Sequence, residues 1–160
     1  MRKTKAWTTL MMGGLALLLV AAPLVAHHLF GAEFDRDAPM RLEGRVVRID
    51  WVNPHMWIHM EVSRMVQGTT EIVPDDPSEE VWRVEGGPPS ALVRRGLRRE
   101  CLLYGTQLIV NGYQARDHTL KRANGRDVTF PGGGRFFLGS SVPDAPQDGA
   151  EARASQRGRC

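Results

Sequence analysis

The segment from Trp51 to His59 constrains the fold most strongly, because it joins two alternating runs through a tight Asn53-Pro54 corner. Proline cannot donate a hydrogen bond to a strand ladder and biases the preceding residue toward extended geometry, so we expect the chain to turn there. Alternation of apolar and polar residues is typical of half-buried strands. We therefore expect strands over residues 42–51 and 56–62. The faces expected to be buried carry Val47, Ile49 and Trp51 in the first strand and Met56, Ile58, Met60 and Val62 in the second.

The rest of the pattern predicts further short strands and one short helix. The later strands are expected over residues 81–85, 107–114 and 127–130, with residues 135–138 completing a last strand or hairpin. Ser90 can cap a helix over residues 91–95, which Gly96 ends. Residues 65–80 and 116–126 are rich in polar residues, and we interpret them as loops.

The order of these elements indicates a mainly β fold. Three strands, a short helix and two strands follow one another as in a small OB-like five-stranded barrel, whose helix lies between strands three and four. Gly44, early in the first strand, suits the bend that such a barrel needs. An open antiparallel sheet with one helix is the alternative. We expect this β domain over residues 42–139, preceded by an N-terminal arm over 27–41 and followed by a disordered tail over 140–160.

The N-terminal residues 1–26 have the composition of a cleaved export signal. Three basic residues precede an apolar run over residues 10–22, and Pro23 ends that run before a cut after Ala26. The alternative is an uncleaved anchor, since residues 6–26 carry no charge and are long enough to cross a bilayer. We expect cleavage, a periplasmic or secreted location and no stable membrane insertion afterwards.

The charge balance of the expected mature chain argues against a nucleic-acid partner. The whole chain carries 21 Lys and Arg residues against 18 Asp and Glu residues. Three of the basic residues and none of the acidic ones lie in the signal, which leaves 18 of each sign. A basic composition indicates nucleic acid or an anionic membrane only if the charge remains in the folded product.

The two cysteines, Cys101 and Cys160, allow at most one disulfide in an oxidising compartment. Cys101 lies beside an expected strand, and Cys160 ends a polar tail. We expect a buried Cys101 and a free thiol in the tail, with a bridge between the two as the alternative.

The histidines suggest a copper site at the new N-terminus. A cut after Ala26 makes His27 the first residue, whose α-amino and ring nitrogens form one chelate. A second imidazole completes a set of three nitrogens that suits the tetragonal preference of Cu(II). His28, His55 and His59 are the candidate partners. The alternation places His59 on the solvent face, whereas His55 lies at the corner, nearer to where the arm can fold. The alternative is that these are surface histidines, since their spacing matches no zinc motif.

Trp57 and His59 form a second candidate site for a ligand. The alternation places both on the outer face of the second strand, and an exposed aromatic ring there is typical of a stacking platform for a base or sugar. Packing at the barrel rim is the alternative for Trp57. The sequence shows no credible catalytic set, so we do not expect an enzyme. A copper oxidase that uses the N-terminal site is the enzymatic alternative.

A set of motifs follows in fixed order over about residues 26–138. They are His27-His28-x-Phe30-x-x-Glu33-Phe34-Asp35, Gly44-x-Val46, Asp50-Trp51-x-Asn53-Pro54-His55-x-Trp57-Ile58, Trp82-x-Val84-Glu85 and Pro89-x-x-Leu92-x-Arg94-x-Gly96. Together they resemble a family of small exported bacterial proteins known only as a domain of unknown function. The family usually has Ser where Leu29 stands and often Trp where Leu97 stands. The resemblance implies an exported, compact β-rich domain and supplies no activity.

The paired histidines and the Asn-Pro-His corner of that pattern are similar to the N-terminal histidine copper sites of periplasmic copper-resistance proteins and lytic polysaccharide monooxygenases. Those proteins have other folds, so the likeness concerns the site alone. The sequence thus favours an exported binding or accessory protein that holds copper through His27, His28 and His55. The alternative is a metal-free binding module for a small molecule, a glycan or a partner protein.

Overall fold

The computed structural model of the protein describes residues 30–139, and the expected signal and tail lie outside them. The expected mainly β class is confirmed. The strands are β1 (Phe34–Asp50), β2 (Trp57–Gln67), β3 (Thr70–Ile72), β4 (Val81–Glu85), β5 (Gln107–Ala115), β6 (Arg122–Thr129) and β7 (Arg135–Phe137). The helical pieces are residues 30–33, η1 (Pro77–Glu79), α2 (Pro89–Arg94) and η2 (Arg99–Leu102). No helix in this described part of the chain is long and apolar enough to cross a membrane.

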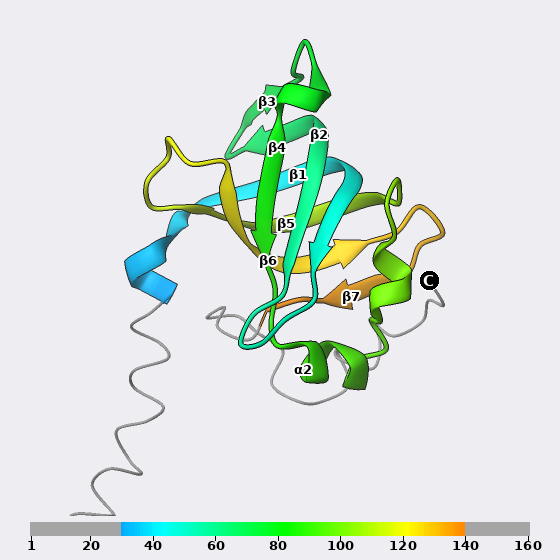
Figure 1. Ribbon diagram of the computed structural model, residues 1–160. Helices are drawn as coiled ribbons and strands as arrows, with labels where there is room; N and C mark the ends of the chain where they lie inside the picture. The colour runs from blue at the N-terminus through cyan, green and yellow to red at the C-terminus, as the bar shows by residue number, and fades with distance from the viewer. Residues whose placement is uncertain (1–29, 140–160) are drawn as a thin grey trace, which may run out of the picture.

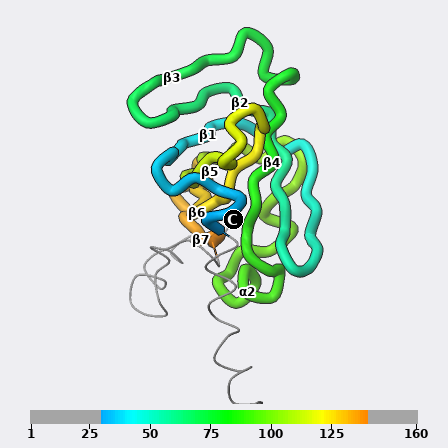
Figure 2. The backbone as a smooth tube through the Cα atoms, turned by 90° about the vertical axis from the view of Figure 1, so that its left-hand side faces the viewer, coloured from blue at the N-terminus to red at the C-terminus, as the bar shows by residue number. Residues whose placement is uncertain are grey.

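Five of the strands close a ring through hydrogen-bonded pairs. β1 pairs with β2, β2 with β4, β4 with β6, β6 with β5, and β5 with β1. The β4–β6 pair is parallel and the other four are antiparallel. β3 forms a hairpin with β2, and β7 adds to β6. Figures 1 and 2 show the β3 hairpin above one end of the ring and α2 below the other.

Two glycines permit close approaches between neighbouring strands. Gly44 of β1 follows a bulge at Glu43, and a Cβ atom on Gly44 would lie 1.9 Å from the backbone oxygen of Glu61. A Cβ on Gly112 of β5 would lie 2.1 Å from the backbone oxygen of Asn124. Only a residue without a Cβ fits at such distances. Glycine is therefore required at both positions for steric reasons.

The core is formed by the inward faces of the ring strands together with α2 and η2. The predicted inward face of β2 is confirmed, since Met56, Ile58, Met60 and Val62 are all fully buried. In β1 the inward face changes at a bulge between Val46 and Arg48. A bulge adds one residue to one strand and so shifts its alternation. Val46 is therefore buried before the bulge, while Ile49 and Trp51 pack against the core after it.

The strands extend further than the sequence pattern predicted. β1 begins at Phe34, so residues 34–41, expected in the arm, belong to the sheet. Residues 65–80, expected as a loop, contain the end of β2 and all of β3. The loop predicted over residues 116–126 is wrong from Arg122 onward, where β6 begins.

The helix α2 ends as the sequence predicts but starts earlier. Ser90 lies inside the helix, and no side chain caps its N-terminus. Gly96 follows the helix with φ 88°. The Leu97 amide donates to the Leu92 carbonyl at 3.0 Å and the Gly96 amide to the Val93 carbonyl at 3.0 Å. This pair of bonds is a Schellman motif, which favours glycine at the left-handed position.

Cys101 lies in η2, where it is buried and disulfide-bonded. Its Sγ also accepts a hydrogen bond from the Arg98 amide at 3.4 Å. The burial of Cys101 is confirmed, but the expectation that it takes no part in a bridge is wrong. The other cysteine of the chain, Cys160, lies outside the described residues.

Candidate functional site

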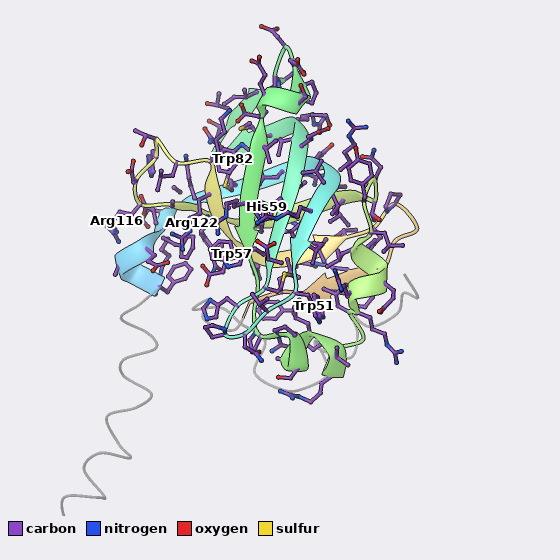
Figure 3. The ribbon with its side chains drawn as sticks, viewed as in Figure 1. Trp51, Trp57, His59, Trp82, Arg116 and Arg122 are labelled. Carbon is purple, nitrogen blue, oxygen red and sulfur yellow. The ribbon has the colours of Figure 1, made fainter. Side chains whose placement is uncertain are left out.

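A cavity of about 290 Å³ opens beside the Asn53-Pro54 corner, between the ends of β2, β4 and β6 and the first described residues. Its aromatic walls are Phe30, Phe34 and Trp57. Its polar lining residues are Glu33, Asn53, His55, Glu85, Arg122 and Asn124. Figure 3 shows Trp57 and Arg122 close together, beside the segment that precedes β1.

Strand register brings three of these residues into one row. Trp57 of β2 is the register partner of Glu85 of β4, and Glu85 is in turn the partner of Asn124 of β6. The corner itself is tied to the residues that follow β4. The Gly86 amide donates to the Met56 carbonyl at 2.9 Å, and the Met56 amide donates to the Gly87 carbonyl at 3.3 Å. The row and the corner together place His55 over the end of β4.

His55 contacts the buried carboxylate of Glu85. The Nδ1 atom of His55 meets Oε1 of Glu85, and the two form an ion pair when the ring is protonated. Where Glu85 is ionised, its carboxylate only accepts hydrogen bonds, and Nδ1 is then the donor. In the neutral ring, Nε2 then keeps its lone pair. The side chain of His55 is 38% exposed, so a ligand can reach its ring.

Arg122 links the segment before β1 to the ring. Its Nη2 lies 2.6 Å from Oε2 of Glu33 and 3.5 Å from Oε2 of Glu85. The guanidinium also lies over two aromatic rings, 5.3 Å from the centre of Phe34 and 4.8 Å from that of Trp57. Such cation–π contacts and ion pairs hold a side chain in one place when they act together. Arg122 therefore helps to fix the aromatic wall of the cavity.

Three buried polar atoms at this cavity have no hydrogen-bond partner. They are Oε2 of Glu85, Nε of Arg122 and Oδ1 of Asn124. Most buried polar groups in proteins are paired, because an unpaired one loses its hydration without compensation. All three atoms belong to residues that line this one cavity.

The two residues of the predicted outer-face site lie in different surroundings. Trp57 lines the cavity, and the guanidinium of Arg83 also lies over its ring at 4.5 Å from the centre. His59 does not line the cavity. Its Nε2 lies 2.8 Å from Oδ2 of Asp50, which Arg48 also contacts through two hydrogen bonds. The structure thus brings His55 and Trp57 together and places His59 in a separate ionic cluster.

That cluster predicts a pH-dependent contribution to stability. Hydrogen bonds from Arg48, then from His59, hold the pKa of the Asp50 carboxyl well below its usual range. A carboxyl with a lowered pKa in the folded state adds stability above its ordinary pKa and loses it as the pH falls. Asp50→Asn should therefore lower the free energy of unfolding near pH 7 by up to about 1 kcal/mol, with the difference shrinking below about pH 4. Thermal unfolding of both proteins across this range measures the effect.

Asp37→Asn is the matched control, since it makes the same chemical change at an exposed position of β1. It should leave the unfolding curve unchanged across the range. A difference between wild type and Asp50→Asn that persists undiminished at acid pH would contradict the assignment to this carboxyl.

The predicted metal ligands His27 and His28 lie outside the described residues. Phe30, the first described residue, lines the same cavity as His55. Within residues 30–139, no group of three or more His, Cys, Asp or Glu side chains could hold a metal ion. Of the three predicted ligands, the structure therefore describes His55 alone.

The sequence analysis missed Glu85, Arg122 and Asn124. Glu85 carried a weak signal, because a charged residue follows the apolar Val84 directly before a glycine-rich break. Arg122 and Asn124 carried none, because they stand in a polar run that has no period-two pattern. Their roles arise from the pairing of β6 with β4, which no local pattern shows.

Comparison with known proteins gives one match. Residues 16–124 match a family described as a family of unknown function, DUF6152. No curated protein and no solved structure matches the chain significantly. The matched residues make up more than half of the chain and include His55, Trp57, Glu85 and Asn124. The expectation of an uncharacterised family is confirmed, and the chain belongs to DUF6152.

Proposed function

We propose that this protein is an exported binding protein that holds copper through His27 and His55, with His28 assisting. The observation that carries this proposal is the contact between Nδ1 of His55 and the buried carboxylate of Glu85. Export is supported by the composition of residues 1–26, whose basic start, apolar run and small-residue end are those of a cleaved signal.

We further propose that the ring is an OB-like barrel that serves as a rigid frame for the site. The strand order β1-β2-β4-β6-β5 and the single parallel pair β4–β6 support this assignment. So does α2, which lies in the sequence between the third and fourth ring strands and buries Leu92 in the core. The cavity lies where β4 ends and where β2 and β6 begin, and strands position side chains more rigidly than loops do.

The environment of His55 suits a metal ligand. A histidine that binds a metal through one ring nitrogen commonly donates its other N–H to a carboxylate, which orients the ring and makes it more basic. Glu85 stands in that relation to His55 and leaves Nε2 for the metal. The formal charges of Glu33, Glu85 and Arg122 sum to one negative charge at the cavity, which favours a cation.

The other predicted ligands, His28 and His27, precede Phe30 by two and three residues in the sequence. An extended chain spans at most about 3.6 Å per residue, so this short stretch allows both to reach the vicinity of Phe30. Phe30 itself lines the cavity. If cleavage follows Ala26, the α-amino and ring nitrogens of His27 join the ring of His55. Three nitrogens in this arrangement suit Cu(II).

The role assigned to Glu85 can be tested by Glu85→Gln, which keeps the shape of the side chain and removes its charge. Copper affinity, measured by competition with a chelator of known strength, should fall by about 10- to 100-fold. Glu61→Gln is the control, because Glu61 pairs with Arg45 and does not line the cavity. Equal affinity in the wild type and Glu85→Gln would remove the main support for the site.

A further inference from the structure

The three unpaired polar atoms of the cavity form a pattern that copper binding does not use. Glu85 meets His55 through Oε1, while its Oε2 has no hydrogen-bond partner. Oδ1 of Asn124 and Nε of Arg122 are likewise buried without a partner. We propose that these atoms bind a free α-amino acid, with its ammonium group at Glu85 and Asn124 and its carboxylate at Arg122. This inference goes beyond the copper site and does not depend on it.

Two of the atoms are acceptors on facing residues of neighbouring strands. Glu85 and Asn124 are register partners on β4 and β6, and each is only 5% exposed. Both oxygens are buried and lack a hydrogen bond, so a donor from a ligand would stabilise each of them. An ammonium group supplies three donors on one nitrogen and can satisfy both oxygens at once.

The third atom, Nε of Arg122, is a hydrogen-bond donor in the same cavity. Nη2 of Arg122 bonds Glu33 at 2.6 Å, but it lies 3.5 Å from Oε2 of Glu85, too far for a strong hydrogen bond. Nε of Arg122 has no hydrogen-bond acceptor, and in this proposal it donates to the carboxylate of the ligand. A donor on Arg122 beside an acceptor on Glu85 matches a molecule whose ammonium and carboxylate groups share one carbon atom.

The remaining walls define what the ligand carries beyond its head groups. Phe30, Phe34 and Trp57 present aromatic surface to a cavity of about 290 Å³. Such walls favour an apolar side chain, and this volume suits a small ligand. A zwitterion also adds no net charge to the cavity, so no charge is buried without a partner. These features together favour a small apolar amino acid.

The test is isothermal titration of the intact, N-terminally sequenced protein with L-alanine, L-valine and L-leucine, each alone. A strong chelator is present, so that copper cannot bridge the protein and the amino acid. At least one of the three should bind. Its N-acetyl derivative lacks the ammonium group and its amide lacks the carboxylate, so each should bind at least about ten-fold more weakly.

Asn124→Ala removes one acceptor without touching His55. It should weaken amino-acid binding about ten-fold or more. Gln107→Ala, which removes an exposed amide that does not line the cavity, should change neither amino-acid binding nor copper affinity. The proposal is overturned if none of the three amino acids binds, because water then satisfies these atoms. It is also overturned if the two derivatives of the bound amino acid bind as well as the parent. Copper binding is measured in a separate titration without the chelator. Loss of amino-acid binding can therefore be distinguished from loss of copper binding.

Discussion

Gly44→Ala is expected to destabilise the fold severely, lowering the free energy of unfolding by about 3 kcal/mol or more. The added methyl group would lie 1.9 Å from the backbone oxygen of Glu61 and 2.9 Å from the Cα atom of Val62. Both atoms belong to the backbone of β2, so no side-chain rotation relieves the clash. The β1–β2 pairing would have to move apart at this point, which weakens the ring that supports the cavity.

Denaturant unfolding followed by circular dichroism measures this effect. The matched control is Gly132→Ala, at a position where a Cβ atom meets nothing within 4 Å and φ is not positive. Alanine there should change stability by less than about 1 kcal/mol. Similar unfolding midpoints for Gly44→Ala and Gly132→Ala would mean that β1 and β2 do not approach each other as described.

Phe136→Ala is expected to cost about 3–5 kcal/mol of stability, the range found when a large buried aromatic side chain is removed. Phe136 is fully enclosed in the main core, although β7 lies outside the ring. Its ring meets that of Phe130 edge to face, with 5.6 Å between the centres. It also lies beside Gly96 after α2, where an added Cβ atom would be 3.5 Å from the ring. Loss of this ring therefore removes contacts between β7, β6 and the helical segment.

The same unfolding measurement applies, with Leu103→Ala as control. Leu103 is 62% exposed, so its truncation should change the free energy of unfolding by no more than about 0.5 kcal/mol. A loss below about 1 kcal/mol for Phe136→Ala would contradict the position of residues 135–137 against the core.

The elements that the sequence predicted are those with a regular local pattern. In β2, alternation from Met56 to Val62 identified the inward face correctly, because one side of that strand faces the core throughout. In β1, the pattern correctly placed Ile49 and Trp51 against the core, but it chose Val47 where the buried residue is Val46. The bulge after Val46 changes which residues point inward, and a bulge depends on the partner strand rather than on the sequence of one strand.

The missed strands are polar, so their pairing is decided by distant partners. The residues from Phe34 to Pro39 show no alternation, yet Phe34 pairs with Ala115 and Pro39 with Tyr113. The residues of β6 read as a loop because asparagine, glycine and aspartate are rare in strands. In the folded ring, Asp127 is buried and accepts hydrogen bonds from Asn111 and Arg135. Satisfied buried polar groups of this kind give no signal in a hydropathy pattern.

The candidate site was predictable only in part for the same reason. The corner drew attention to His55 and Trp57, and both line the cavity. The partners that give the cavity its chemistry come from β4 and β6, which are separated from the corner along the chain. Sequence spacing cannot show that Glu85 meets His55 or that Arg122 lies over Trp57.

The most direct test of the copper site is a Cu(II) titration of N-terminally sequenced protein, followed by electron paramagnetic resonance, beside His27→Ala and His55→Ala. The account predicts a mature chain that begins at His27 and binds one tight equivalent of copper with nitrogen hyperfine structure. That signal should be lost in His27→Ala and weakened in His55→Ala, while His118→Ala, at an exposed position outside the cavity, should behave as the wild type. Copper binding that is no tighter in the wild type than in the first two variants would contradict the proposed function.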